Sequence, residues 1–203
     1  MDSPNLNMLT VTKKTGAEQF HADGQVLPFD VLGFWRWSSS DLVGNTMRGI
    51  LAEYLVAYDL GVTASMRVEW DAYDLVTKQG LKVEVKSAAY LQSWHQRKLS
   101  PISFDIRPTT GWDAATNTTS AIRRRQAEVY VFALLHHQDK TTLDPLNVEQ
   151  WEFFIVPALT LDNKMPNQKR ISLTTLKQLN PVNAQFGEIA AVTGRLFTGQ
   201  ANE

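Results

Sequence analysis

The 203-residue chain contains no cysteine, so it forms neither disulfide bonds nor thiolate metal sites. It also has no apolar run long enough to cross a bilayer, and its first residues lack the basic-then-apolar pattern of a secretory signal. We therefore expect a cytoplasmic protein with no membrane partner. A formal net charge of −1 argues against a uniformly positive surface for nucleic-acid storage, but it leaves room for a local basic strip.

The composition is that of a soluble globular protein, with 43% apolar and 20% charged residues. No internal repeat and no low-complexity linker divides the chain. We expect one domain over residues 1–203, with a core from about 38 to 160 and covering helices within 171–197.

The most informative segment spans residues 70–87, where two β-rich runs flank a polar turn. A three-residue loop over 78–80, with Gly80 in the left-handed region, predicts a hairpin in which the numbers of paired residues sum to 158. Asp74 then faces Glu84 on one side of the hairpin. The other predicted pairs are Ala72/Lys86, Tyr73/Val85 and Leu75/Val83.

Two carboxylates directly opposite each other repel, because their Cβ atoms lie only about 4.5–5.5 Å apart. A divalent cation between Asp74 and Glu84 removes this repulsion. Mg²⁺ prefers oxygen ligands and keeps several waters, so these carboxylates and the carbonyl of Val85 suffice as ligands. On the same face, Lys86 is placed to orient or deprotonate a water, or to stabilise charge on a phosphate.

The same residues have a simpler interpretation. The sequence 82–86 alternates charged residues with valine, as any half-exposed antiparallel strand does, and Glu84 then belongs to a solvated ladder of charges. The position of Asp74 favours the metal site, as do the small residues 87–89 that follow, because they let a substrate backbone come close.

A helix is predicted before the hairpin, from residues 38–41, which supply N-cap candidates, to about Leu60, where Gly61 stops it. Glu53 lies among its apolar residues. This glutamate is either an exposed solubilising charge or a further acidic ligand that acts through water.

This order of residues resembles the PD-(D/E)xK nuclease superfamily, although Tyr73 stands where the superfamily's name has proline. The resemblance implies an α/β (α+β) fold of the restriction endonuclease type, with a central mixed sheet flanked by helices. It implies a Mg²⁺-dependent site, with Mn²⁺ as an alternative, that cuts DNA. Asp74 and Glu84 match the metal ligands, Lys86 the catalytic lysine, and Glu53 and Gln92 the auxiliary residues.

Further elements follow the hairpin. Residues 102–106 alternate as a strand, 108–120 read as a polar loop that is a flap or carries Trp112 as a plug, and 128–135 and 151–156 are apolar strands. The basic residues that could contact phosphates are Arg97, Lys98, Arg107 and the run Arg123, Arg124 and Arg125. The three-arginine run is alternatively a solvated edge. Aromatic residues 34–37 are expected to pack against the hairpin rather than to stack on bases.

Three classes of function remain open. The first is a metal-dependent DNA endonuclease, for which a homodimer is plausible because cutting two strands usually takes two sites. The second is a catalytically inactive nucleic-acid-binding protein on the same fold. The third is a hydrolase whose two carboxylates act as acid and base, as in glycosidases, and the lysine argues against it.

Overall fold

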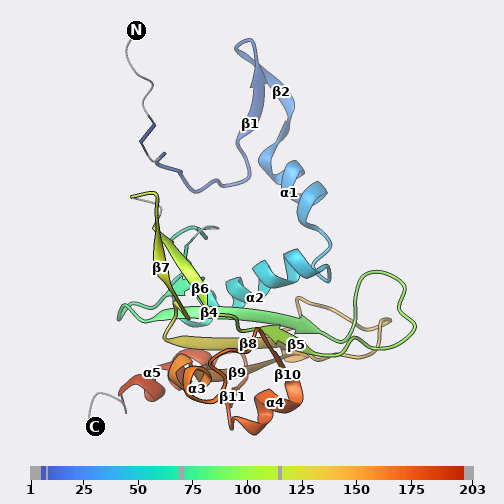
Figure 1. Cartoon of the computed structure of the whole chain (residues 1–203). Helices are drawn as coiled ribbons and strands as arrows, with labels where there is room; N and C mark the ends of the chain where they lie inside the picture. Colours follow the sequence, from blue (N-terminus) through green and yellow to red (C-terminus); the bar gives the residue numbers. More distant parts are fainter. Residues whose placement is uncertain (1–5, 8, 69–70, 114–115, 199–203) are drawn as a thin grey trace.

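A five-stranded mixed sheet forms the centre of the molecule, in the order β11-β9-β8-β4-β3 (Figure 1). The computed structural model describes residues 6–7, 9–68, 71–113 and 116–198. The strands of the sheet are β3 (Leu75–Val76), β4 (Lys82–Ala89), β8 (Val129–Leu135), β9 (Trp151–Pro157) and β11 (Val182–Ala184). β4 and β8 are parallel and the other neighbours are antiparallel. The expected α/β class with a central mixed sheet is confirmed.

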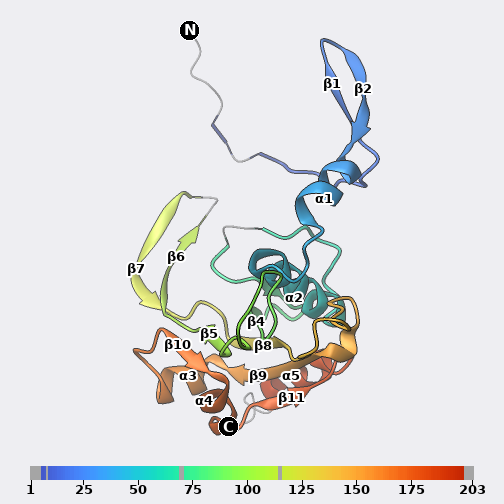
Figure 2. The same cartoon turned by 90° about the vertical axis from the view of Figure 1, so that its right-hand side faces the viewer.

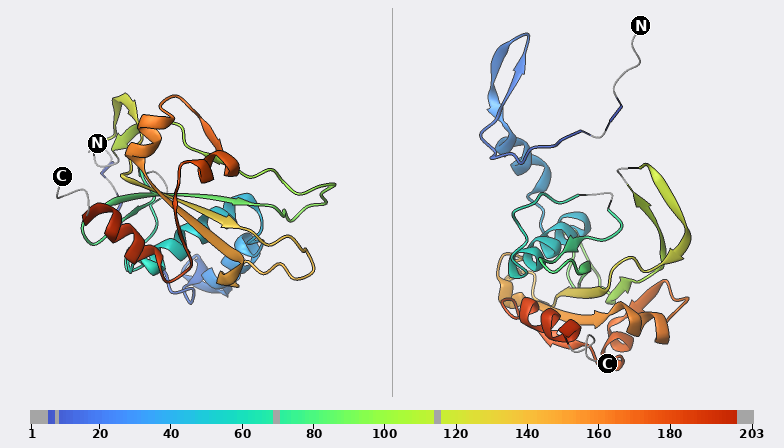
Figure 3. Two further views of the ribbon diagram at one scale, coloured as in Figure 1. Left: turned by 90° about the horizontal axis from the view of Figure 1, so that it is seen from below. Right: turned by 90° about the vertical axis from the view of Figure 1, so that its left-hand side faces the viewer.

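Both faces of the sheet are covered. One face packs against α2 (Asn45–Asp59) and α5 (Ile189–Thr198). The other packs against α3 (Ala158–Lys164), α4 (Leu173–Gln178) and a small ladder of β5 (Ser103–Asp105) with β10 (Arg170–Ser172). Every residue of β8 is buried, as its continuous apolar sequence predicts. A 3₁₀ turn, η1 (Val148–Gln150), precedes β9. Figure 3 shows these layers from two further sides.

The helix before the hairpin is close to the prediction. Asp41 accepts hydrogen bonds from the backbone N–H groups of Val43 (3.1 Å) and Gly44 (2.9 Å), so this turn precedes the helix and α2 begins only at Asn45. At the other end Gly61 has φ of +68°, where glycine is unstrained, and the helix stops there as expected.

The polar loop expected over 108–120 is wrong, because the segment forms a hairpin. Its strands are β6 (Thr109–Asp113) and β7 (Thr118–Arg124), and Asn117 takes a positive φ of 51° at the turn. Each strand begins with two threonines, which favour extended structure despite their polarity. β7 is exposed along its whole length, and Figures 1 and 2 show the hairpin projecting from the body.

A second projection, the N-terminal arm (residues 19–39), extends to the same side of the molecule (Figure 2). It consists of β1 (Gln19–Ala22), β2 (Gln25–Asp30) and α1 (Val31–Ser39), and α1 has no buried residue. Asp30 caps the helix by accepting a 2.7 Å hydrogen bond from the N–H of Gly33. Packing of residues 34–37 against the β3–β4 hairpin is wrong for Phe34 and Trp37, which are 49% and 85% exposed.

Candidate active site

The β3–β4 hairpin adopts the predicted register. Leu75 pairs with Val83 and Val76 pairs with Lys82. Gly80 has φ of +84°, and the N–H of Thr77 donates to the carbonyl of Leu81 at 2.9 Å to close the turn. The local sequence is sufficient for this result, because a left-handed glycine ends the loop and fixes which residues face each other.

Asp74 ends the ladder. Its N–H donates to the carbonyl of Val83 at 3.1 Å, and its Oδ2 accepts a 2.7 Å hydrogen bond from the N–H of Val85. The backbone N–H of Val85 is therefore bonded to the Asp74 carboxyl group rather than to Tyr73. The predicted Tyr73/Val85 pair is not part of the ladder, which contains Leu75/Val83 and Val76/Lys82. Because Asp74 bonds to both neighbours of Glu84, it lies opposite Glu84.

The charge of Glu84 acts on the carboxyl group of Asp74. Burial, followed by the charge of Glu84, raises the pKa of Asp74 to about 7. The charge of Lys86 and the N–H of Val85 lower this pKa, but they do not offset the first two effects. The expected repulsion between the two carboxylates is thus present in the folded protein when no cation is bound.

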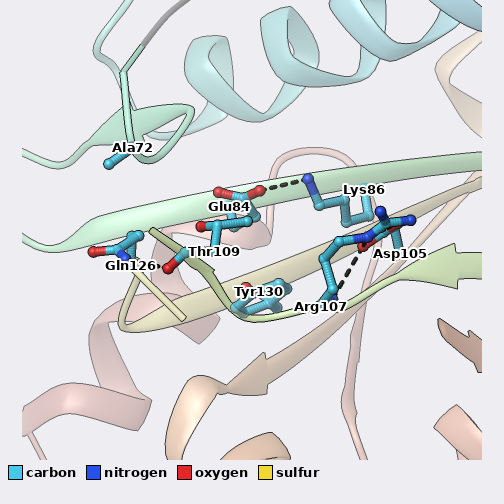
Figure 4. A pocket seen from close by; sticks show the side chains of 8 residues that line it. All are labelled: Ala72, Glu84, Lys86, Asp105, Arg107, Thr109, Gln126 and Tyr130. Atoms are coloured by element: carbon cyan, nitrogen blue, oxygen red, sulfur yellow. Dashed lines mark hydrogen bonds and ion pairs between the residues drawn. The ribbon is translucent and has the colours of Figure 1, made fainter. Parts of the chain in front are cut away.

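Lys86 is paired with Glu84 on the same face of β4, as Figure 4 shows. Burial lowers the pKa of the Lys86 ammonium, but the charges of Glu84 and Asp74 outweigh burial and raise the pKa above its ordinary value. Lys86 is therefore a cation in this structure, which favours stabilisation of negative charge over deprotonation of a water.

Glu84 and Lys86 open into a cavity of about 190 Å³ (Figure 4). The other residues that line it come from four segments of the chain and are Ala72, Asp105, Arg107, Thr109, Gln126 and Tyr130. Tyr130 is the β8 partner of Glu84, and burial followed by the charge of Glu84 raises its phenol pKa. Sequence reasoning missed Asp105, Gln126 and Tyr130 as members of the site, because only the folded sheet brings them to β4.

A protein-family model described as bacteriophage T4 endonuclease IV matches residues 36–174. The chain belongs to this family. The match covers more than half of the 203 residues and includes every residue that lines the cavity. The expectation of a nuclease is therefore confirmed at the level of the endonuclease IV family. None of the curated proteins compared with the chain matches it.

In this endonuclease IV family member, Glu53 is close to only part of the candidate site. It forms an ion pair with Arg67 and lines a larger cavity of about 670 Å³ together with Asp74. Its charge contributes to the raised pKa of Asp74, but Glu53 does not line the cavity of Glu84 and Lys86. Glu53 therefore affects the candidate site through the effect of its charge on Asp74.

Gln92 lies away from this cavity. It is buried, accepts a 3.4 Å hydrogen bond from Nη1 of Arg48 and donates to the carbonyl of Ala89 at 3.2 Å. Arg48, itself buried, also donates through Nε to the hydroxyl of Ser87 at 3.2 Å. These contacts join α2 to the end of β4, so in this structure Gln92 supports the strand rather than contacting the site.

The three consecutive arginines separate into two kinds. Arg123 and Arg124 are exposed on β7. Arg125 is buried and donates to Asp162 (2.6 Å), to the carbonyl of Ile106 (3.0 Å) and to the carbonyl of Met165 (2.8 Å). Because its donors are used inside the protein, the structure places Arg125 at the base of the hairpin and leaves only its two neighbours available to phosphates.

The donor set suits a hard divalent cation. Asp74, directly before β3, and Glu84 on β4 both offer carboxylate oxygens. Burial and the charge of Glu84 raise the pKa of Asp74, and a bound cation would offset both effects. Within the described part of the chain, no group of three or more Asp, Glu, His or Cys side chains could hold a metal. A bound ion would therefore depend on two carboxylates, the Val85 carbonyl and water, and Mg²⁺ tolerates such a shell.

None of the described helices is long and apolar enough to span a bilayer.

Proposed function

We propose that this member of the endonuclease IV family hydrolyses phosphodiester bonds in DNA with a Mg²⁺- or Mn²⁺-dependent site of the PD-(D/E)xK type. The observation that carries the proposal is the β3–β4 hairpin, which sets Asp74 opposite Glu84 and directs Lys86 into the same cavity as Glu84. The family match supports nuclease activity independently of this geometry.

The residues have distinct roles in this proposal. Asp74, Glu84 and the carbonyl of Val85 would hold the metal ion, which would lower the pKa of a water and neutralise charge on the phosphate. Lys86 remains protonated beside Glu84 and stabilises the negative charge that develops on the phosphate oxygens. The N–H of Val85 holds the Asp74 carboxyl group in place.

Cleavage of DNA by the purified protein tests the proposal. We expect cutting of at least one of supercoiled, linear, single-stranded and four-way-junction DNA in Mg²⁺ or Mn²⁺, and none in EDTA. Cutting that persists in EDTA would exclude the metal site. No cutting of any substrate, together with no Mn²⁺ binding in calorimetry, would instead support an inactive nucleic-acid-binding protein on this fold.

The exposed arginines of β7 are proposed to contact phosphates. Replacing Arg123 and Arg124 with serine should weaken DNA binding on all sequences, because phosphate contacts carry no sequence information. The slope of log affinity against log salt should become shallower by about 1 for each phosphate that the variant no longer neutralises. A double variant of Lys140 and Lys177, which are exposed elsewhere, removes the same charge and should leave the slope unchanged.

We also propose a homodimer. The N-terminal arm supports it, because α1 has no fully buried residue, Trp37 is 85% exposed, and a two-stranded hairpin by itself is only marginally stable in water. Light scattering on the full chain should give twice the 22.9 kDa monomer mass, and Trp37→Asp should lower it. Trp94→Asp is the matched control, at a 54% exposed tryptophan outside the arm. A monomeric wild-type protein would contradict this proposal.

A further inference from the structure

The cavity beside Lys86 contains a second cation that the proposed mechanism does not use. Arg107 follows β5 and lines the same cavity as Lys86, and Figure 4 shows both side chains there. Each cation is held by a carboxylate, Lys86 by Glu84 and Arg107 by Asp105. The charge of Asp105 also contributes to the raised pKa of Lys86, so the two pairs are neighbours.

Asp105 presents the guanidinium of Arg107 in a fixed orientation. Nε of Arg107 donates to Oδ1 (3.0 Å) and Oδ2 (2.7 Å) of Asp105, and Nη2 lies 2.5 Å from Oδ2. The backbone N–H of Arg107 donates to the same carboxylate at 3.0 Å. The Arg107 side chain is nevertheless 51% exposed. An ion pair that is this exposed to water contributes little to stability, so an incoming oxyanion can replace the carboxylate.

The ligand that suits this site is a phosphate group. A guanidinium offers a planar fork of donors that matches phosphate oxygens as well as it matches the carboxylate of Asp105. Nearby, the hydroxyl-bearing Thr109 lines the same cavity at the start of β6.

Three basic residues follow one another from the cavity toward the β6–β7 hairpin. Arg107 precedes Pro108, and Nη2 of Arg123 donates to the carbonyl of Pro108 at 3.2 Å. Lys86, Arg107 and Arg123 thus form a path from the cavity onto the β6–β7 hairpin. A chain with successive phosphates fits such a path, whereas a compound with one phosphate would use only its first position.

We propose that Arg107 binds a phosphate adjoining the one that is cleaved, and that Asp105 holds the guanidinium until substrate replaces it. This inference rests on the proposed function and defines its substrate as a polynucleotide with neighbouring phosphates. The effect of Arg107 is therefore on substrate binding, and Lys86 keeps its effect on the reaction at the cleaved bond.

Two substrates separate these roles. On an oligonucleotide that the wild-type protein cuts, Arg107→Ala should raise KM about tenfold or more and change kcat by less than about threefold. On thymidine 5′-(p-nitrophenyl phosphate), which has a single phosphodiester, Arg107→Ala should match wild type. Arg107→Lys should recover part of the affinity because the charge remains. Arg195→Ala is the control, since Arg195 is exposed on α5, which covers the other face of the sheet, and does not line the cavity.

Binding of a fluorescent oligonucleotide in EDTA gives a readout that does not depend on cleavage. Arg107→Ala should bind about tenfold or more weakly than the control variant Arg195→Ala. Equal binding by these variants, or equal losses on both cleavage substrates, would overturn the inference even if wild type is an active nuclease. If wild type cuts nothing but Arg107→Ala still loses binding, the proposed function fails and the phosphate subsite stands.

Discussion

Replacing Lys86 with alanine should reduce DNA cleavage about 10²- to 10³-fold while leaving DNA binding nearly unchanged. Lys86 is a protonated side chain in the cavity, and removing one group that stabilises transition-state charge has an effect of this size. Single-turnover cleavage in Mn²⁺ measures the rate, and fluorescence anisotropy in EDTA measures binding.

Two further variants make this test specific. Lys86→Met keeps the aliphatic stem of the lysine, so a comparable loss of rate would exclude a packing defect as its cause. Lys82→Ala removes a lysine from the same strand, and Lys82 lies over the Tyr73 ring rather than in the cavity. We expect Lys82→Ala to retain near wild-type rates. Equal cleavage by wild type and both Lys86 variants would contradict a catalytic role for this residue.

Replacing Asp74 with asparagine should abolish Mn²⁺ binding and at the same time stabilise the metal-free protein above neutral pH. The pKa of Asp74 is raised from 3.8 to about 7 by burial and by Glu84. A carboxyl whose pKa is higher folded than unfolded binds its proton more tightly in the folded state, so stability falls as pH rises from about 4 to about 7. An asparagine carries no charge and can still accept from the N–H of Val85.

Thermal unfolding in EDTA at several pH values checks this prediction. The melting temperature of wild type should fall between pH 5 and pH 8, by about 2–4 °C for each kcal/mol lost from the free energy of unfolding. The melting temperature of Asp74→Asn should fall less over the same range. Mn²⁺ at pH 8 should raise the melting temperature of wild type and not that of the variant. Asp71→Asn, an exposed carboxylate nearby, should behave as wild type. Parallel pH profiles for wild type and Asp74→Asn would show that the pKa of Asp74 is not raised in the folded protein.

The sequence predicts the parts of the molecule that depend on neighbours along the chain. The β3–β4 register follows from Gly80 and the alternation around it, and the buried β8 follows from its apolar run. The β6–β7 hairpin was not predicted because its strands have almost no apolar alternation. Threonine propensity was the available signal, and polarity obscured it.

The cavity depends on contacts that no local pattern contains. Tyr130 meets Glu84 only because β8 runs parallel to β4, and Asp105 approaches Lys86 only because β5 lies beside the sheet. The sequence also does not reveal which polar residues are buried. Gln92 and Arg125 were expected at functional positions, yet both are buried with hydrogen-bond partners from distant segments.

The anchoring of Arg125 bears on how this family can diversify. Its side chain joins the end of β7 to the segment after β5 and to α3, through Ile106, Asp162 and Met165. The root of the β6–β7 hairpin is thereby fixed to the core, while β7 is exposed along its length. Insertions and deletions in the distal hairpin can therefore accumulate during evolution without disturbing the sheet or the cavity. Substrate preference can change in one part of the molecule while the machinery in another part stays constant.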